Sequence, residues 1–234
     1  MRHAWNSTAA CLAIIPLLAI AGCSKGSDAP QPATASLNGP TGDGAAPAAG
    51  SPTGAGAAQS DQDPLHPIVV VETSLGDFTV RLDAEKAPLT VDNFLLYVAG
   101  HHYDQTIFHQ VLKDYPHIVL GGAYTTDLAE KKARTPIRNE AHNGLKNRRA
   151  TIAMARLPNH QDTATCHFFI NLADNEVLDY KDRTTQGYGY CVFGEVIKGI
   201  ETVDRIGSVA VHDTDKFERI PAETVLIKSI RRTK

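Results

Sequence analysis

The chain has 234 residues, a formal net charge of −3 and 21% charged residues, a length that allows one large domain or two small ones. A near-neutral charge argues against a nucleic-acid-binding protein, which needs a concentrated basic face. The two short basic clusters, Lys131-Lys132 and Arg148-Arg149, are typical of solvated loops.

Residues 1–22 have the pattern of a signal peptide. Arg2 gives a positive start and residues 9–21 are almost wholly apolar. As a helix this run reaches only about 20 Å, too short for a hydrocarbon layer of about 30 Å. It ends in Ile20-Ala21-Gly22-Cys23, which resembles a bacterial lipobox. We expect lipidation of Cys23. The alternative is an ordinary cleavage site beside a chance cysteine.

Ser24 follows the lipobox cysteine where an aspartate would favour retention in the inner membrane. We therefore expect a lipid-anchored protein of the bacterial cell envelope, on the outer membrane and facing the periplasm. Residues 24–66 are mostly Ala, Gly, Pro, Ser and Thr, with only Leu37 and Leu65 as large aliphatic residues. Such a segment buries too little apolar area to order itself, so it is predicted to be a disordered tether.

Two cysteines, Cys166 and Cys191, remain in the predicted folded part, residues 67–234. An oxidising compartment would permit a disulfide between them. The sequence does not place their Cα atoms within disulfide range. Two buried free thiols are the simpler interpretation.

The folded part reads as short strands with two helices. A hairpin is predicted at 68–71 and 78–82, around turn residues 74–77. A helix follows from Pro88, with apolar residues at helical spacing up to Gly100. Further strands are predicted at 106–112, 150–156, 167–171, 190–196 and 223–231, and a second short helix spans 200–206, closed by Gly207. This pattern indicates one mainly β domain, either a barrel or a sandwich.

Seven strings, taken together and in order, resemble the bacterial branch of the cyclophilin-type peptidyl-prolyl cis-trans isomerases. The resemblance covers residues 68–232. It implies a closed eight-stranded antiparallel barrel capped by two α-helices, with a proline-binding groove on one side. The strings are APLTVDNF (87–94), TIFH (106–109), PIRNEA (136–141), NGLKN (143–147), IAMAR (152–156), FFIN (168–171) and QGYGYCVF (186–193).

The chemistry that the resemblance implies is rotation about an X-Pro bond, whose barrier is about 18–20 kcal/mol. Rotation breaks no σ bond, so we expect no cofactor and no metal. None of the ten histidines falls in a zinc-ligand spacing. An isomerase must instead hold the proline ring in an apolar pocket and donate hydrogen bonds to the twisted amide. In cyclophilins an arginine is the main donor.

By resemblance, Phe169 and Leu178 form the proline pocket and Tyr190 lies at its rim. Ala155 and Arg156 match the stretch that contacts the peptide backbone. His167 stands where the family usually has glutamine. It lies two residues before Phe169, so strand alternation puts both side chains on one face.

Other positions depart from the family pattern. The catalytic arginine should follow Phe108-His109, but Gln110 stands there. The segment from 110 to 121 is two residues longer than usual, around Tyr115 and Pro116. With the extra residues there, His117 takes the place of a pocket aromatic, Ile118 that of a methionine and Leu120 that of a glutamine. Alternatively, Tyr115 turns in as the pocket aromatic.

Three functions are compatible with these residues. The first is an isomerase, with reduced turnover, that assists the folding of exported proteins. The second is a non-catalytic, chaperone-like module that binds proline-containing peptides; the missing arginine favours it. The third is an anchored domain with a vestigial groove. For each we expect a monomer whose partners are proline-containing segments or, in the third case, none.

Overall fold

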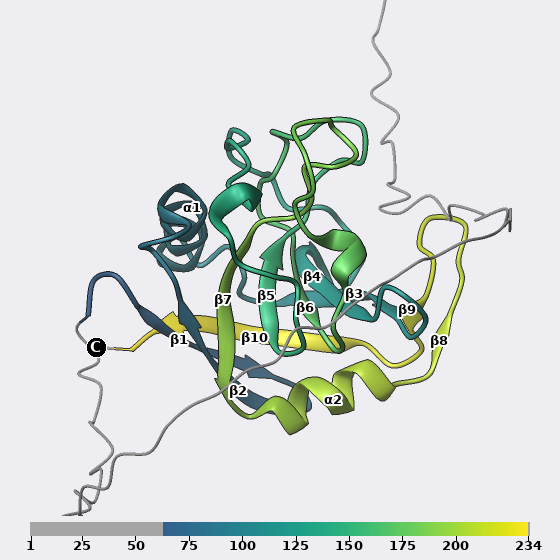
Figure 1. Cartoon of the computed structure of the whole chain (residues 1–234). Coiled ribbons are helices and arrows are strands. Elements are labelled where there is room, and N and C mark those ends of the chain that lie inside the picture. Colours follow the sequence, from purple (N-terminus) through teal and green to yellow (C-terminus); the bar gives the residue numbers. More distant parts are fainter. Residues whose placement is uncertain (1–62, 234) are drawn as a thin grey trace, which may run out of the picture. The chain divides into compact units, whose positions relative to one another are not determined.

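The computed structural model describes residues 63–233 (Figure 1). The predictions for the signal peptide, for Cys23 and for the linker up to residue 62 lie outside the described residues. Residues 63–66 already form a turn ahead of the predicted domain boundary at 67, and the Leu65 N–H donates to Asp63 Oδ1 at 2.9 Å. Within 63–233, no helix is both long enough and apolar enough to cross a bilayer.

Eight strands close into an antiparallel barrel in the order β1-β10-β3-β4-β6-β5-β7-β2. This confirms the expected fold and removes the choice between barrel and sandwich. The barrel strands are β1 (Ile68–Thr73), β2 (Gly76–Leu82), β3 (Thr106–Leu112), β4 (Ile118–Thr125), β5 (Thr151–Met154), β6 (Phe168–Asn171), β7 (Val192–Lys198) and β10 (Val225–Arg232). A separate ribbon pairs β8 (Val211–His212) with β9 (Ile220–Pro221).

Strand β4 was not predicted, because Gly121-Gly122 interrupts its apolar pattern. Both glycines are needed for packing. A Cβ atom added to Gly121 would lie 2.8 Å from the Phe108 ring. Gly122 has a φ of +94°, and a Cβ atom added to it would lie 2.8 Å from the Phe168 ring. The backbone of β4 therefore approaches core rings more closely than any larger residue permits.

Helix α1 (Pro88–Ala99) begins at its predicted proline, and α2 (Ile200–Ser208) lies close to its predicted range. The start of α1 has no local side-chain cap. Instead, the distant Glu140 accepts N–H bonds from Leu89 at 3.2 Å and Thr90 at 2.9 Å. Gly207 does not end α2 as predicted. It lies inside the helix, where a Cβ would meet Leu172 at 2.4 Å, so it is a packing residue.

The core fills the barrel. Inward side chains of all eight strands meet the apolar faces of α1 and α2, which lie at opposite ends of the barrel in Figure 1. Phe94 of α1 packs its ring 5.1–5.8 Å from those of Tyr103, Phe168 and Phe193. Two short 3₁₀ turns, η1 (Ala141–Asn143) and η2 (Glu176–Leu178), lie in the connections.

Cys166 and Cys191 are free thiols in the described structure, and both are buried. Burial raises the pKa of Cys166 to about 11 and that of Cys191 to about 12. Both are therefore protonated and unreactive at neutral pH.

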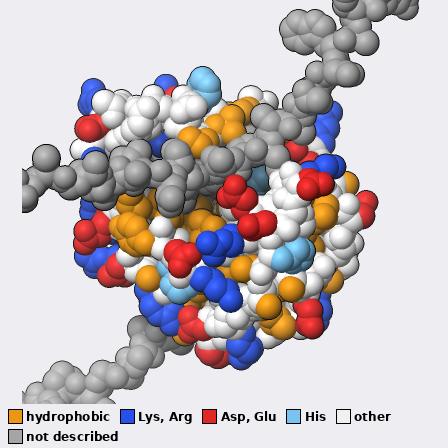
Figure 2. Space-filling model, turned by 90° about the vertical axis from the view of Figure 1, so that its right-hand side faces the viewer, with side chains coloured by type: hydrophobic (Ala, Val, Ile, Leu, Met, Phe, Trp, Pro, Cys, Tyr) orange, Lys and Arg blue, Asp and Glu red, His pale blue; other side chains and the backbone are white. Residues whose placement is uncertain are grey.

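The visible surface mixes charges of both signs. Lys and Arg side chains are interspersed with Asp and Glu on the face shown in Figure 2.

Candidate functional site

The predicted site residues meet on the outer face of the barrel, along one row of cross-strand partners. Gln110 of β3 pairs with Leu120 of β4, Leu120 pairs with Phe169 of β6, and Phe169 pairs with Ala153 of β5. Directly opposed residues of neighbouring strands point to the same side of a sheet. Gln110 therefore shares a face with Leu120 and Phe169.

A β-bulge decides that Gln110 faces outward. Strict alternation would put Gln110 on the same side as Phe108, whose ring lies in the barrel core. The register of β3 against β4 instead shifts between Phe108 and Gln110, so that His109 is the extra residue. Beyond the shift, Val111 points into the core and Leu112 points outward.

A second apolar cluster, the outer cluster, surrounds this row. Its members come from four strands, from the segment after β5 and from η2, and they are buried: Ile118, Leu120, Ala153, Ala155, Phe169, Leu178 and Val192. Leu112, Leu145 and Tyr190 pack against it and are partly buried. The Tyr190 ring stands edge-on to that of Phe169, with centroids 5.7 Å apart. The cluster thus unites six of the residues assigned by resemblance: Ile118, Leu120, Ala155, Phe169, Leu178 and Tyr190.

Three buried asparagines hold the outer cluster in place, and the sequence analysis gave them no role. Asn175 accepts the His117 N–H at 2.9 Å and donates to the His117 carbonyl at 3.0 Å, which fixes the start of β4. Asn147 donates to the Leu178 carbonyl at 3.0 Å and so fixes η2. Asn171 joins them, donating to Asn147 and accepting from Asn175. The sequence offered one hint of this role: an asparagine placed next to an apolar strand must find a hydrogen-bond partner if it is buried.

Arg156 is buried, and its guanidinium holds the loop that leads to Tyr190. It donates to four backbone carbonyls at 2.8–3.1 Å, those of Leu157, Pro158, Thr185 and Gly189. It also lies 4.9 Å from the centroid of the Tyr190 ring, within cation–π range. Burial lowers its pKa from the usual value, but an arginine stays charged at any physiological pH. Because its donors are used in these bonds, Arg156 supports the Tyr190 loop and does not replace the arginine that is missing at position 110.

His167 lies on the predicted face, at one end of the outer cluster. Its carbonyl accepts the Ala155 N–H at 2.9 Å. Its ring contacts those of His109 and Tyr124, at 5.6 and 5.8 Å between centroids, and its Nε2 lies 3.8 Å from Glu130 Oε1. Burial lowers the pKa of His167 to about 4. Burial and the neighbouring His167 together lower the pKa of His109 well below its usual value. Neither imidazole is a cation at neutral pH.

This burial predicts a pH-dependent stability. Since His167 binds its proton near pH 6.5 when unfolded and at about 4 when folded, the unfolded state takes up more protons between these values. The free energy of unfolding should fall as pH drops through that window, by about 3 kcal/mol from His167 alone. Urea unfolding at pH 7 and pH 4.5 measures this. His167→Gln should reduce the dependence and leave the part that comes from the buried His109; an unchanged dependence in that variant would contradict the assignment.

His117 and Tyr115 both lie outside the outer cluster. The backbone of His117 is held by Asn175, and its side chain is partly exposed. Tyr115 is 61% exposed, and its hydroxyl accepts the Val177 N–H at 3.0 Å, which fixes the end of its ring against η2. Tyr115 therefore does not turn in as the pocket aromatic. It stands beside Leu178 as an exposed ring next to the cluster.

Comparisons with known proteins agree with this architecture. The family model "Cyclophilin type peptidyl-prolyl cis-trans isomerase/CLD" matches residues 68–232. The chain is 41% identical over 163 residues to peptidyl-prolyl cis-trans isomerase A of Dickeya dadantii, covering 70% of this chain and 83% of that protein. It is also 41% identical over 163 residues to peptidyl-prolyl cis-trans isomerase B of Escherichia coli, covering 98% of that protein.

A solved structure has the same fold. The Cryptosporidium parvum cyclophilin-type isomerase, crystallised in the presence of the dipeptide Ala-Pro, superimposes with a TM-score of 0.56 at 23% identity. The match covers 71% of this chain and 99% of that one.

Proposed function

The chain belongs to the cyclophilin-type peptidyl-prolyl cis-trans isomerase family, and from this premise we propose that it binds proline-containing segments of exported proteins at the outer cluster and isomerises them slowly. Peptidyl-prolyl isomerase function follows by homology. The observation that carries the finer proposal is the place of Gln110: it lies on the outer face, one strand from Leu120 and two from Phe169, where the family has its arginine.

The proline ring is assigned to the apolar surface around Phe169, Leu178 and Ile118, with Tyr190 at its rim. We assign Ala155 to the same surface and the partly exposed His117 to its edge, outside the outer cluster. The burial of the Arg156 guanidinium against carbonyls supports a role in shaping this surface, with the peptide meeting Tyr190 above it.

Slow turnover follows from the donors that remain. As the X-Pro amide twists, its nitrogen becomes a hydrogen-bond acceptor, and catalysis needs a donor aimed at it. Gln110 offers only a neutral N–H, and charge-assisted hydrogen bonds are roughly twice as strong. Arg156 is occupied by carbonyls, and the buried His109 and His167 are neutral at pH 7. Neither Arg156 nor these two histidines therefore supplies a cation in place of the missing arginine.

The same observation favours a second function, a proline-peptide-binding module without turnover. The apolar cluster serves either function, because binding needs the pocket and catalysis needs the pocket and the donor. The slow isomerase and the binding module differ only in whether Gln110 stabilises the transition state enough to make isomerisation faster than the uncatalysed reaction. The uncatalysed reaction takes tens to hundreds of seconds.

NMR exchange spectroscopy on an Ala-Pro peptide tests the proposal. We expect shift changes in the peptide on adding the chain, with cis–trans exchange that is faster than uncatalysed but well below that of the Escherichia coli relative at equal concentration. Exchange equal to that of the relative would contradict reduced turnover. Shift changes without faster exchange would mean that the chain is a binding module without turnover. No shift changes would mean that the groove is vestigial and binds no proline peptide.

We further infer that lipid on Cys23 anchors the domain to the outer membrane, where exported proteins fold. The lipobox-like residues 20–23 and Ser24 support this inference. On expression in a Gram-negative bacterium, the wild-type chain should sediment with outer membranes and Cys23→Ser should not. Equal sedimentation of the two would contradict lipid anchoring, and sedimentation with inner membranes would contradict the assignment from Ser24.

A further inference from the structure

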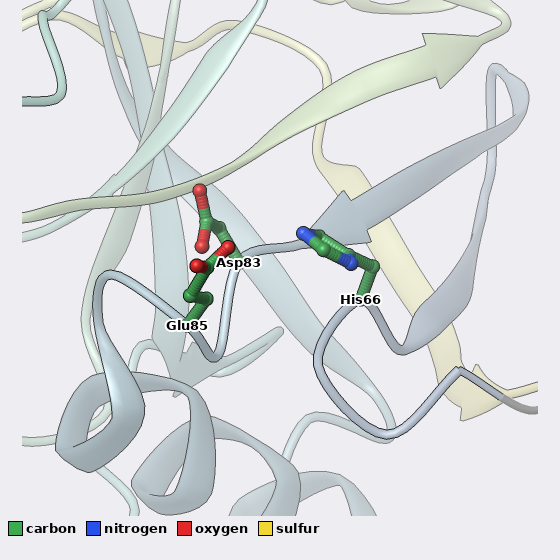
Figure 3. Close-up of side chains that lie close together, drawn as sticks. All are labelled: His66, Asp83 and Glu85. Carbon is green, nitrogen blue, oxygen red and sulfur yellow. The ribbon is translucent and has the colours of Figure 1, made fainter.

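A group of donor side chains lies where the described chain begins, and it shares no residue with the outer cluster. His66, Asp83 and Glu85 each place one nitrogen or oxygen atom within 4.8 Å of the other two (Figure 3). In Figure 3 the imidazole of His66 points across a gap toward the two carboxylates, which approach from the loop between β2 and α1. Within the described residues this is the one such group of three.

Backbone pairing brings these side chains together. The Leu82 N–H donates to the Pro67 carbonyl at 2.9 Å, and the Ala84 N–H donates to the Leu65 carbonyl at 2.8 Å. These two bonds hold His66 alongside Asp83. The Asp83 N–H in turn donates to the Phe193 carbonyl of β7 at 2.8 Å, which ties the loop to the barrel.

A fourth residue, Asp63, orients the imidazole from behind. Its Oδ2 lies 2.8 Å from His66 Nδ1, so a proton on Nδ1 is donated to Asp63 and the Nε2 lone pair is left free. A carboxylate on the far nitrogen is the usual outer support of a metal-binding histidine, because it fixes the tautomer and the ring.

Among residues 63–233, the two carboxylates, those of Asp83 and Glu85, have no lysine or arginine as an ion-pair partner. Asp83 Oδ1 accepts the Lys86 backbone N–H at 2.9 Å, which holds the carboxylate in place without neutralising its charge. Two like charges at this separation repel each other and favour a bound cation.

We propose that His66, Asp83 and Glu85 bind a divalent transition metal of the zinc type, with Asp63 as the positioning residue for His66. One imidazole with two carboxylates suits zinc, whereas calcium and magnesium prefer oxygen ligands alone. Zinc ligands at about 2.1 Å from the metal lie roughly 3.4 Å apart. The exposed Glu85 can close the remaining distance by a change of rotamer. Water completes the coordination.

The bound ion would clamp residues 63–66 to the loop that leads into α1. That places the metal at the junction between the N-terminal segment and the barrel, so its role is to fix the junction rather than to act on a peptide.

The chain provides a matched control at His101 and Asp104. These residues have the same three-residue spacing as Asp63 and His66 and a similar contact, 3.1 Å from His101 Nδ1 to Asp104 Oδ2. They belong to no group of three donors among the described residues. Within residues 63–233, His101 thus has a carboxylate partner alone, whereas His66 belongs to a complete donor set.

The test is calorimetric titration of the full-length chain, without a histidine tag, with zinc chloride. We expect one zinc ion per chain that an equal concentration of magnesium or calcium does not displace. His66→Ala should lower the zinc affinity at least tenfold, and Asp63→Asn about tenfold through the orientation of His66. Glu85→Gln, at an exposed position, should also weaken binding, and His101→Ala should not.

Amide spectra recorded during the titration should show the zinc-dependent shifts concentrated at residues 63–67 and 82–87. The same spectra show whether each variant remains folded. Absence of zinc binding would overturn the proposal. So would zinc binding that survives both His66→Ala and Glu85→Gln, or that is lost equally in His101→Ala.

Discussion

Gln110→Arg is expected to raise kcat/KM for an Ala-Pro peptide about a hundredfold over the wild-type chain. The side chain at this position starts on the outer face, beside Leu120 and close to Phe169. A guanidinium there would donate a charge-assisted hydrogen bond to the proline nitrogen as it loses conjugation. One preorganised donor at the transition state is worth about 3 kcal/mol. Exchange spectroscopy at matched enzyme concentration measures the gain.

Two variants separate the guanidinium from other effects. Gln110→Lys adds the charge without the planar fork, so it should recover only part of the gain. Gln110→Arg combined with Leu120→Gln also restores an amide at the adjacent cross-strand position. We expect this pair to exceed the single arginine variant, because the amide can hold the guanidinium in place. No gain in any of the three would mean that the groove no longer presents an X-Pro bond to this position.

Arg156→Ala is expected to lower the free energy of unfolding by about 3–5 kcal/mol. Arg156 is only 4% exposed, and its guanidinium donates to four backbone carbonyls. Its removal leaves buried acceptors without donors, at about 1–3 kcal/mol for each one that water does not reach. Urea unfolding measures the loss. Because Arg156 also lies over the Tyr190 ring, the variant should bind a proline peptide more weakly even where it is fully folded.

Arg156→Lys is the matched control. It keeps the charge but presents one compact ammonium group in place of the five-donor fork. It should therefore lose less stability than Arg156→Ala while still disturbing the Tyr190 loop. If Arg156→Ala costs less than about 1 kcal/mol and leaves the Tyr190 resonances unmoved, the guanidinium does not hold this loop together.

Sequence reasoning assigned residues that lie together in the structure, but it did not predict what holds them in place. Phe169, Leu178, Ile118, Leu120, Ala155 and Tyr190 were assigned by resemblance, and the structure places all six in one cluster. The asparagines at 147, 171 and 175 were missed as positioning residues. Their role depends on which carbonyls come within reach, and those belong to residues up to 58 positions away. The donor group at His66, Asp83 and Glu85 was missed because its spacing matches no metal-binding motif.

The ambiguity between His117 and Tyr115 shows the same limit. Two extra residues in a loop have several placements, and the sequence contains no information on which aromatic side chain turns inward. In the structure neither lies in the outer cluster: Asn175 holds the His117 backbone, and the Tyr115 hydroxyl accepts the Val177 N–H. Both contacts join segments more than 50 residues apart, so local pattern cannot reveal them.

The sequence by itself determined the mainly β class, both helices, seven of the eight barrel strands and the family. Apolar periodicity and turn chemistry are local properties, and the family strings are read directly from the chain. Only the tertiary structure decided that Gln110 points outward, that the Arg156 guanidinium is bonded to backbone carbonyls and that His66 lies near two carboxylates. The bulge at His109, the carbonyls around Arg156 and the pairing of residues 65–67 with 82–84 all depend on contacts made after the barrel closes. Periodicity reports which face a residue prefers, whereas register and hydrogen-bond partners are set by the neighbouring strand.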